Sequence, residues 1–168
     1  TDTPTNNAAT LDPLSSSINV PTFSEGNLKV LTQADSMAAV CSTIGVANGR
    51  WYAECKYSAR GANDNCSIGI CDNPSLSNSE NTNSDSGGAG AVTAYYQASN
   101  GHVHNFNAEP TLSAGNSNAL STLAPGDIIG IYMDLEDMKL YFSKNGNLEN
   151  STGISLAAST SRASGTGF

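Results

Sequence analysis

Two histidines placed two residues apart are the groups of this sequence best spaced to bind a metal. In an extended strand His102 and His104 share one face, as a pair of metal ligands would. No cysteine or carboxylate is matched to them by its spacing. We therefore predict a polar pair whose contacts respond to pH, and not a metal site.

Three neighbouring carboxylates, Asp134, Glu136 and Asp137, could offer oxygen ligands to a calcium ion. The cluster lacks the glycine and the terminal glutamate of a dedicated calcium loop. We interpret it as the solvated tip of a hairpin.

The hydroxyl and carboxyl groups show no catalytic pattern. The sequence contains no Gly-x-Ser-x-Gly elbow, and nothing pairs a nucleophile with a histidine and an acid. Gly87-Gly88 has no following lysine, so it is not a phosphate loop. A glycosidase needs two carboxylates in one cleft, and the pattern brings no two of the candidates together: Glu54, Asp64, Glu109 and Asp127. We predict a protein that is not an enzyme and that uses no cofactor.

Charge excludes two classes of partner. The 168 residues include 7 Lys and Arg against 15 Asp and Glu, for a net charge of -8. Neutralising nucleic-acid phosphates or an anionic membrane surface requires many basic side chains. We therefore expect neither a nucleic-acid partner nor a membrane partner.

The four cysteines, Cys41, Cys55, Cys66 and Cys71, do not have the spacing of a metal ribbon or a redox motif. We predict four free thiols. One disulfide is the alternative, and the sequence does not select its pair.

Alternation of apolar and polar residues defines the expected strands. Residues 126–147 read as two strands, with Ile129, Ile131, Met133 and Leu135 on one face of the first and Leu140 and Phe142 on one face of the second. Residues 49–58 form another strand, with Trp51 expected in the core. Turn signals recur every 8–15 residues, which favours an all-β, antiparallel β-sandwich.

The ends and loops complete this organisation. Residues 1–26 carry three prolines and are expected to form an extended N-terminal arm, followed by one domain over residues 27–168. Residues 33–40 are expected to hold a short helical turn, and residues 73–90 a long polar loop.

A hairpin over residues 91–106, turning at Ser99-Asn100-Gly101, carries the best binding candidates. Tyrosine supplies contact area at low entropic cost, and asparagine supplies adaptable hydrogen bonds. The candidate ligand- or partner-binding residues are Tyr95, Tyr96, Asn100, His102, His104 and Asn105.

Four segments, in this order, resemble the SPRY domain. They are GRWYAECKY, CSIGICD, AYYQASNGHVHNFNA and GDIIGIYMDLEDMKLYFSKNGN, which together span roughly residues 45–150. The resemblance implies a two-sheet, jelly-roll-type sandwich that recognises partners through loops at one end, here residues 59–65, 73–90 and 107–120. Family members continue past the Asn-Gly turn with further strands, and residues 148–168 match these poorly. A missing strand would leave a sheet edge open to another chain.

The opening residues, TDTPTNNAATLDPLSS, are similar to a lead-in of SPRY-like domains in tailed-bacteriophage proteins. This resemblance implies a virion protein assembled in the host cytoplasm. The first hypothesis is a capsid decoration or tail component that docks on other virion proteins and forms a homo-oligomer. The alternative is a receptor-binding module of a tail or head fibre that recognises a host surface glycan or protein.

Overall fold

Antiparallel strands make up the regular structure of this chain. A computed structural model describes residues 8–15, 21–31, 38, 40–59, 66–71, 93–105 and 120–156. Within them the only helical element is a single 3-10 turn, η1 (Pro13–Ser15). The strands are β1 (Thr22–Ser24), β2 (Lys29–Leu31), β3 (Arg50–Lys56), β4 (Ser67–Cys71), β5 (Thr93–Gln97), β6 (Val103–Asn105), β7 (Ile128–Asp134), β8 (Lys139–Lys144), β9 (Asn147–Leu148) and β10 (Ile154–Ser155). The predicted all-β class is confirmed.

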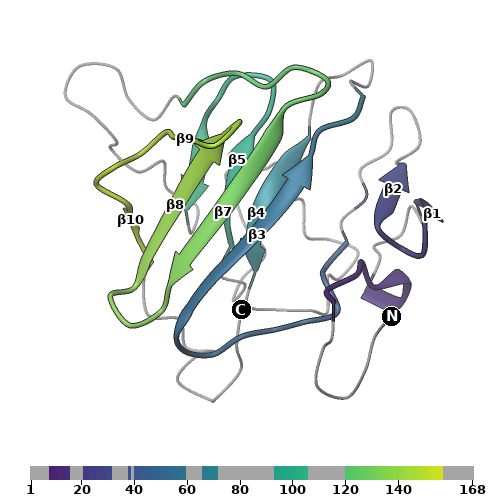
Figure 1. Cartoon of the computed structure of the whole chain (residues 1–168), viewed down its shortest axis with the longest axis horizontal. Helices are drawn as coiled ribbons and strands as arrows, with labels where there is room; N and C mark the ends of the chain where they lie inside the picture. The colour runs from purple at the N-terminus through teal and green to yellow at the C-terminus, as the bar shows by residue number, and fades with distance from the viewer. Residues whose placement is uncertain are drawn as a thin grey trace.

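Two sheets lie face to face. The first has the order β10-β8-β7-β3, with β9 also paired to β8, and the second has the order β4-β5-β6. In Figure 1 the first sheet lies in front of the second. The hairpin of β1 and β2 forms a small sheet of its own, to the side of the sandwich (Figure 1).

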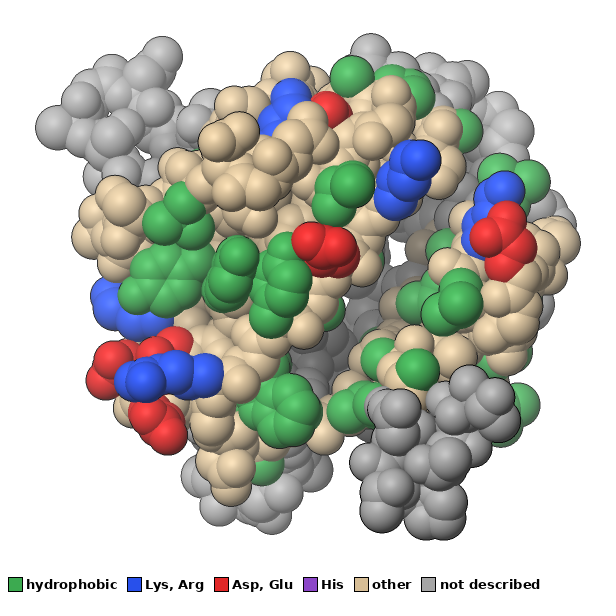
Figure 2. All heavy atoms as spheres, in the orientation of Figure 1, with side chains coloured by type: hydrophobic (Ala, Val, Ile, Leu, Met, Phe, Trp, Pro, Cys, Tyr) green, Lys and Arg blue, Asp and Glu red, His purple; other side chains and the backbone are tan. Residues whose placement is uncertain are grey.

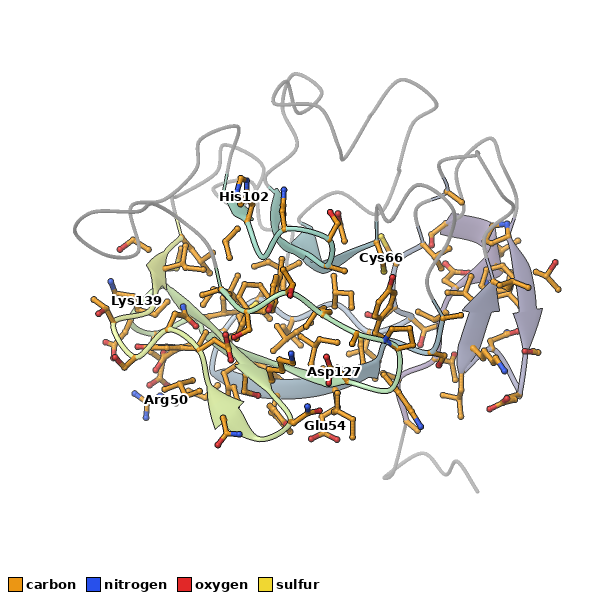
Figure 3. All side chains as sticks on the ribbon, turned by 90° about the horizontal axis from the view of Figure 1, so that it is seen from above. Arg50, Glu54, Cys66, His102, Asp127 and Lys139 are labelled. Carbon is orange, nitrogen blue, oxygen red and sulfur yellow. The ribbon has the colours of Figure 1, made fainter. Side chains whose placement is uncertain are left out.

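The core fills the space between the two sheets, because one face of each strand is apolar (Figure 3). On the first sheet Ile129, Leu140 and Phe142 are completely buried, as the alternation predicted. On the second sheet Tyr96 and Val103 meet them, and the rings of Tyr96 and Phe142 pack edge to face with centroids 5.5 Å apart.

The predicted turn at Asn145-Gly146 joins β8 to β9. Both residues have positive φ, 50° and 81°, as in a type I′ hairpin. The Asn145 amide accepts the Ile128 N–H at 2.9 Å and donates to Asp127 at 2.8 Å. The turn therefore fastens the start of β7 to the end of β8.

One edge of the first sheet is closed. Between β9 and β10, which both pair with β8, the buried side chain of Asn150 takes the place of a strand. It accepts the Phe142 N–H at 2.7 Å and donates to the Leu140 carbonyl at 3.3 Å. The backbone of β8 thus has hydrogen-bond partners on both sides.

The expected domain boundary, loops and free cysteines can be compared with the structure only in part. The boundary expected between residues 26 and 27 falls in the turn of the β1–β2 hairpin, because Thr22–Ser24 pairs with Lys29–Leu31. The polar loop 73–90 lies outside the described residues, as do most of loops 59–65 and 107–120 and of the expected helical turn. Cys41, Cys55 and Cys66 are free thiols.

Candidate interaction edge

The opposite edge of the first sheet, formed by β3, is open. β3 is a seven-residue strand, and every one of its residues is exposed. It pairs with β7 on one side, and no described strand pairs with it on the other. A strand this long with one free side can accept a further strand.

The backbone groups on this free side follow from the pairing with β7. On either side of β3, the Gly49 carbonyl accepts the Leu135 N–H at 3.0 Å, and the Tyr57 N–H donates to the Asp127 carbonyl at 2.9 Å. Both bonds point toward β7. Backbone direction alternates along an antiparallel strand, so residues 51, 53 and 55 also point toward β7. The N–H and C=O groups of the residues between them point outward. We call these groups the open edge: the backbone of Arg50, Tyr52, Glu54 and Lys56.

The side chains of the same four residues lie on the outer face of the sheet, on which Arg50 and Glu54 are seen in Figure 3. The ring of Tyr52 stacks on Tyr132 of β7, with centroids 4.3 Å apart and planes tilted by 36°. Tyr52 remains 49% exposed, so part of its ring is accessible on the outer face of the sheet.

Gly130 makes room for this arrangement. A Cβ atom at Gly130 would lie 2.3 Å from Ser143 Oγ and 2.9 Å from the Tyr52 ring. Tyr52 leans over this bare position and donates a 2.5 Å hydrogen bond to Glu54 Oε1. That bond raises the pKa of Tyr52 above its ordinary value and fixes the direction of the ring.

Arg50 is neutralised by the acidic turn that follows β7. Its guanidinium contacts Asp134 at 2.7 Å, Glu136 at 3.3 Å and Asp137 at 3.9 Å. The Asp134 carboxylate also accepts the N–H groups of Asp137 and Glu136, and these contacts with that of Arg50 hold its pKa below the ordinary value. The turn is solvated, as predicted, but its charge is matched to the start of β3.

Glu54 and Lys56 differ from Arg50, because no ion pair among the described residues involves either of them. Both side chains are exposed. The open edge therefore presents one negative and one positive charge, two residues apart, without charged partners.

The inner side of β3 is apolar, but it is not covered. Trp51, predicted to lie in the core, is 49% exposed, so that prediction is wrong. Its indole N–H donates to the Asn48 carbonyl at 2.7 Å. The face was predicted correctly, since Trp51 pairs with Met133 and Cys55 with Ile129. Among the described strands none lies beside β3 on this side, in agreement with the exposure of the ring.

Two thiols lie near this side. Burial raises the pKa of the Cys66 thiol to about 11, with a smaller contribution from Cys55 nearby. Desolvation likewise raises the pKa of Cys55. At neutral pH both groups are protonated and therefore weak nucleophiles.

A hollow lies beside the open edge. In Figure 1 the β1–β2 hairpin lies on the same side of the sandwich as the free side of β3, and Figure 3 shows the same arrangement from above. Figure 2 shows a cleft between the sheet and this hairpin. Leu28 and Leu31 of the hairpin are 65% and 62% exposed.

The predicted binding hairpin is present as β5 and β6, but its two tyrosines have different surroundings. Tyr96 is completely buried, and its hydroxyl donates to the Ser121 carbonyl, so it is a core residue and no partner can reach it. Desolvation raises the pKa of Tyr96. Tyr95 pairs with His104 across the strands.

The turn of this hairpin is partly accessible. Asn100 is exposed, and its side chain accepts the N–H of the half-buried His102 at 2.9 Å. The side chains of Tyr95, His104 and Asn105 lie outside the described part of the structure. The hairpin therefore brings Asn100 and His102 together, and it separates both from Tyr96.

Sequence reasoning expected an open edge where strands after the Asn145-Gly146 turn would be missing, but β9 and β10 pair with β8 there. The open edge at β3 was missed, although a signal was present. Alternation in residues 49–58 separates Tyr52, Glu54 and Lys56 from the face of Trp51, but the pattern of a strand does not reveal how many neighbours it has. A glycine at position 130, inside an otherwise regular strand, indicated close approach of another group.

Metal and membrane sites receive no support from the described residues. Among them, no group of three or more histidine, cysteine or acidic side chains could hold a metal ion. Nor does that part of the chain contain a helix of the length and hydrophobicity needed to span a bilayer.

Comparison with known proteins identifies the fold and the family. The chain is similar to the SPRY domain of human HERC1, with a TM-score of 0.57 and 17% sequence identity over 90% of this chain and 82% of that one. No curated protein sequence matches it. The SPRY domain family model matches residues 50–161, which include both sheets of the sandwich. The chain therefore belongs to the SPRY domain family.

Proposed function

We propose that this chain is a non-enzymatic structural protein of a virion, a capsid decoration or tail component, that docks on a neighbouring subunit through the open edge of β3. One observation carries the docking proposal. The four outward-pointing residues of β3 offer N–H and C=O groups with no described partner, beside a cleft.

Backbone pairing is a strong basis for such docking. An added strand gains main-chain hydrogen bonds along its length, and alternate side chains supply specificity. The exposed ring faces of Trp51 and Tyr52 would supply apolar area on the two sides of that strand. Trp and Tyr are enriched among residues that contribute most to binding between proteins.

The virion setting has a separate basis. It rests on the similarity of residues 1–16 to the lead-in of phage SPRY-like domains. The acidic net charge of -8 is compatible with a partner that is a protein and not a nucleic acid.

A proline substitution in β3 tests the docking proposal. Glu54→Pro removes an outward N–H and leaves the bonds to β7 intact, and proline is tolerated on the free side of an edge strand. Glu54→Ala is the matched control, since it removes the same carboxylate and keeps the N–H.

The readout is the copy number of the chain in purified phage particles, measured by quantitative mass spectrometry. We expect Glu54→Pro to lower the copy number severalfold further than Glu54→Ala does, because only the proline also removes the backbone donor. Thermal unfolding of both variants verifies that the sandwich is intact. Absence of the chain from particles, or equal incorporation of a folded Glu54→Pro variant, would overturn the proposal.

A further inference from the structure

We infer that the open edge binds an extended antiparallel strand of another protein, and that this strand carries a basic residue opposite Glu54, an acidic residue opposite Lys56 and an aromatic residue opposite Tyr52. The inference rests on the proposed docking function and specifies the chemistry of the partner.

The direction of the strand follows from the sheet. Every strand pair in the described sandwich is antiparallel. An antiparallel addition to β3 continues this pattern and pairs residues directly across from one another. Side chains directly opposite one another on one face lie ~5 Å apart, which is close enough for charges and rings to interact.

The charges of Glu54 and Lys56 on β3 determine where the partner strand carries charged residues. Arg50 already has three acidic neighbours, whereas Glu54 and Lys56 have no ion pair within the described residues. Opposite charges across a strand pair stabilise it, and like charges destabilise it. The partner strand therefore carries, from its N-terminal end, an acid, then two residues later a base.

The aromatic rings of Tyr52 and Trp51 determine which uncharged residues of the partner strand lie opposite β3. Tyr52 stacks on Tyr132, and its side chain remains half exposed on the outer face. An aromatic residue opposite Tyr52 extends this stack onto a third strand. On the inner side the exposed indole of Trp51 leaves space for a small residue opposite it, while the small side chain of Ala53 leaves space for a larger one.

The position of the β1–β2 hairpin indicates whether the open edge binds a single strand or a whole second copy of this chain. The β1–β2 hairpin lies on the free side of β3 (Figures 1 and 3). A second sandwich that continued the sheet would occupy the place of this hairpin, whereas an added strand needs only a position about 5 Å from β3. The occupant we assign is therefore an extended segment of a partner.

Two peptides of identical composition test the pattern. The first contains EVKVYAT, which aligns Glu with Lys56, Lys with Glu54 and Tyr with Tyr52 in the antiparallel register. The control contains KVEVYAT, in which both charges are exchanged. Calorimetric titration on the full chain should show about tenfold tighter binding of the first peptide, because two attractive pairs become repulsive in the control.

The double variant Glu54→Lys with Lys56→Glu provides the reciprocal measurement, and both substitutions are at exposed positions. We expect it to prefer the control peptide by a similar factor. Equal binding of the two peptides, no inversion in the double variant, or no binding of either peptide at millimolar concentration would overturn the inference. A dimer of the chain that Glu54→Pro abolishes in sedimentation would also overturn it, because the occupant would then be a second copy.

Incorporation into particles separates this inference from the proposed function. If the folded Glu54→Pro variant is lost from particles while the charge-exchanged double variant is incorporated normally, docking at β3 stands and the charge pattern is wrong. If Glu54→Pro is incorporated like the unmodified chain, docking at β3 itself is wrong.

Discussion

The two edges of the five-stranded sheet are built in opposite ways. At the β8 edge, two short strands and the Asn150 side chain satisfy the backbone, and alternate residues of β8 are buried. At the β3 edge no described strand follows, and all seven residues are exposed. The same sheet therefore has one edge whose backbone is satisfied and one that has no neighbour among the described strands.

This contrast separates two uses of the same residue types. An aromatic ring on β8, Phe142, has no exposed surface, whereas Trp51 on the same face of β3 is half exposed. A buried ring is held by contacts on all sides, but a ring at an edge has contacts on one side only. Substitutions at the two edges should therefore differ in what they affect.

The largest expected effect is at the closed edge. Phe142→Ala removes a completely buried ring that packs on Tyr96, and it should lower the free energy of unfolding by about 3–5 kcal/mol. Urea unfolding measures this change. Leu148→Ala, at an exposed position of β9, is the control and should change stability by less than about 0.5 kcal/mol. Similar losses in both variants would contradict the contrast.

Asn150 provides a sharper test, because its side chain makes the hydrogen bonds to β8 that a neighbouring strand would otherwise make. Asn150→Ala leaves the Phe142 N–H and the Leu140 carbonyl without partners, at a cost of about 1–3 kcal/mol. Asn147→Ala, at an exposed position on the same edge, is the matched control. Faster amide hydrogen exchange at Phe142 in the first variant alone is the expected result, and unchanged protection would show that Asn150 is dispensable.

Acid should loosen the end of the sheet at which β7 begins and β8 ends. The Ala124 N–H, the Asn145 amide and Lys144 all contact Asp127 and lower its pKa to about 2. Since this value is below that of the unfolded chain, Asp127 stabilises the fold at neutral pH.

That stabilisation decreases as the pH falls from about 4 toward 2. Urea midpoints measured across this range should fall less steeply in Asp127→Asn than in the unmodified chain. Glu25→Gln, on the separate β1–β2 hairpin, serves as the comparison. Equal slopes for Asp127→Asn and the unmodified chain would show that Asp127 does not contribute.

The smallest expected effect on stability is at the open edge. Trp51→Ala removes a half-exposed ring and one hydrogen bond, so the free energy of unfolding should fall by no more than about 1 kcal/mol. Its effect should appear instead in binding, as weaker titration of the EVKVYAT peptide. A loss of stability comparable to that of Phe142→Ala would mean that β3 is part of the core.

The strands were predictable where alternation and turn chemistry agree. The hairpin of β7 and β8 follows from regularly spaced apolar residues, and the Asn145-Gly146 turn adopts the backbone that its sequence favours. The faces predicted for β3, β7 and β8 were assigned correctly, because side chains alternate whatever the neighbours are, whereas Tyr96 of β5 was counted among accessible residues and is buried.

The environment of a residue was less predictable than its face. The number of strands beside Trp51 depends on topology, which alternation does not encode. The burial of Tyr96 could have been inferred, since Ala98 follows it at the same period and Val103 lies opposite it. The neutralisation of Arg50 could not, because its acidic partners are more than 80 positions away and meet it only through the β3–β7 register.

The Asn150 amide has a consequence for stoichiometry. Because it occupies the backbone groups of β8 between two short strands, the β8 edge cannot accept a strand from another molecule. Within the described part of the chain, β3 is then the only long strand of this sheet with a free side, because β9 and β10 have two residues each. If partners dock by strand addition at β3, as proposed above, each copy would bind one neighbour in a fixed ratio and would end an assembly instead of propagating it.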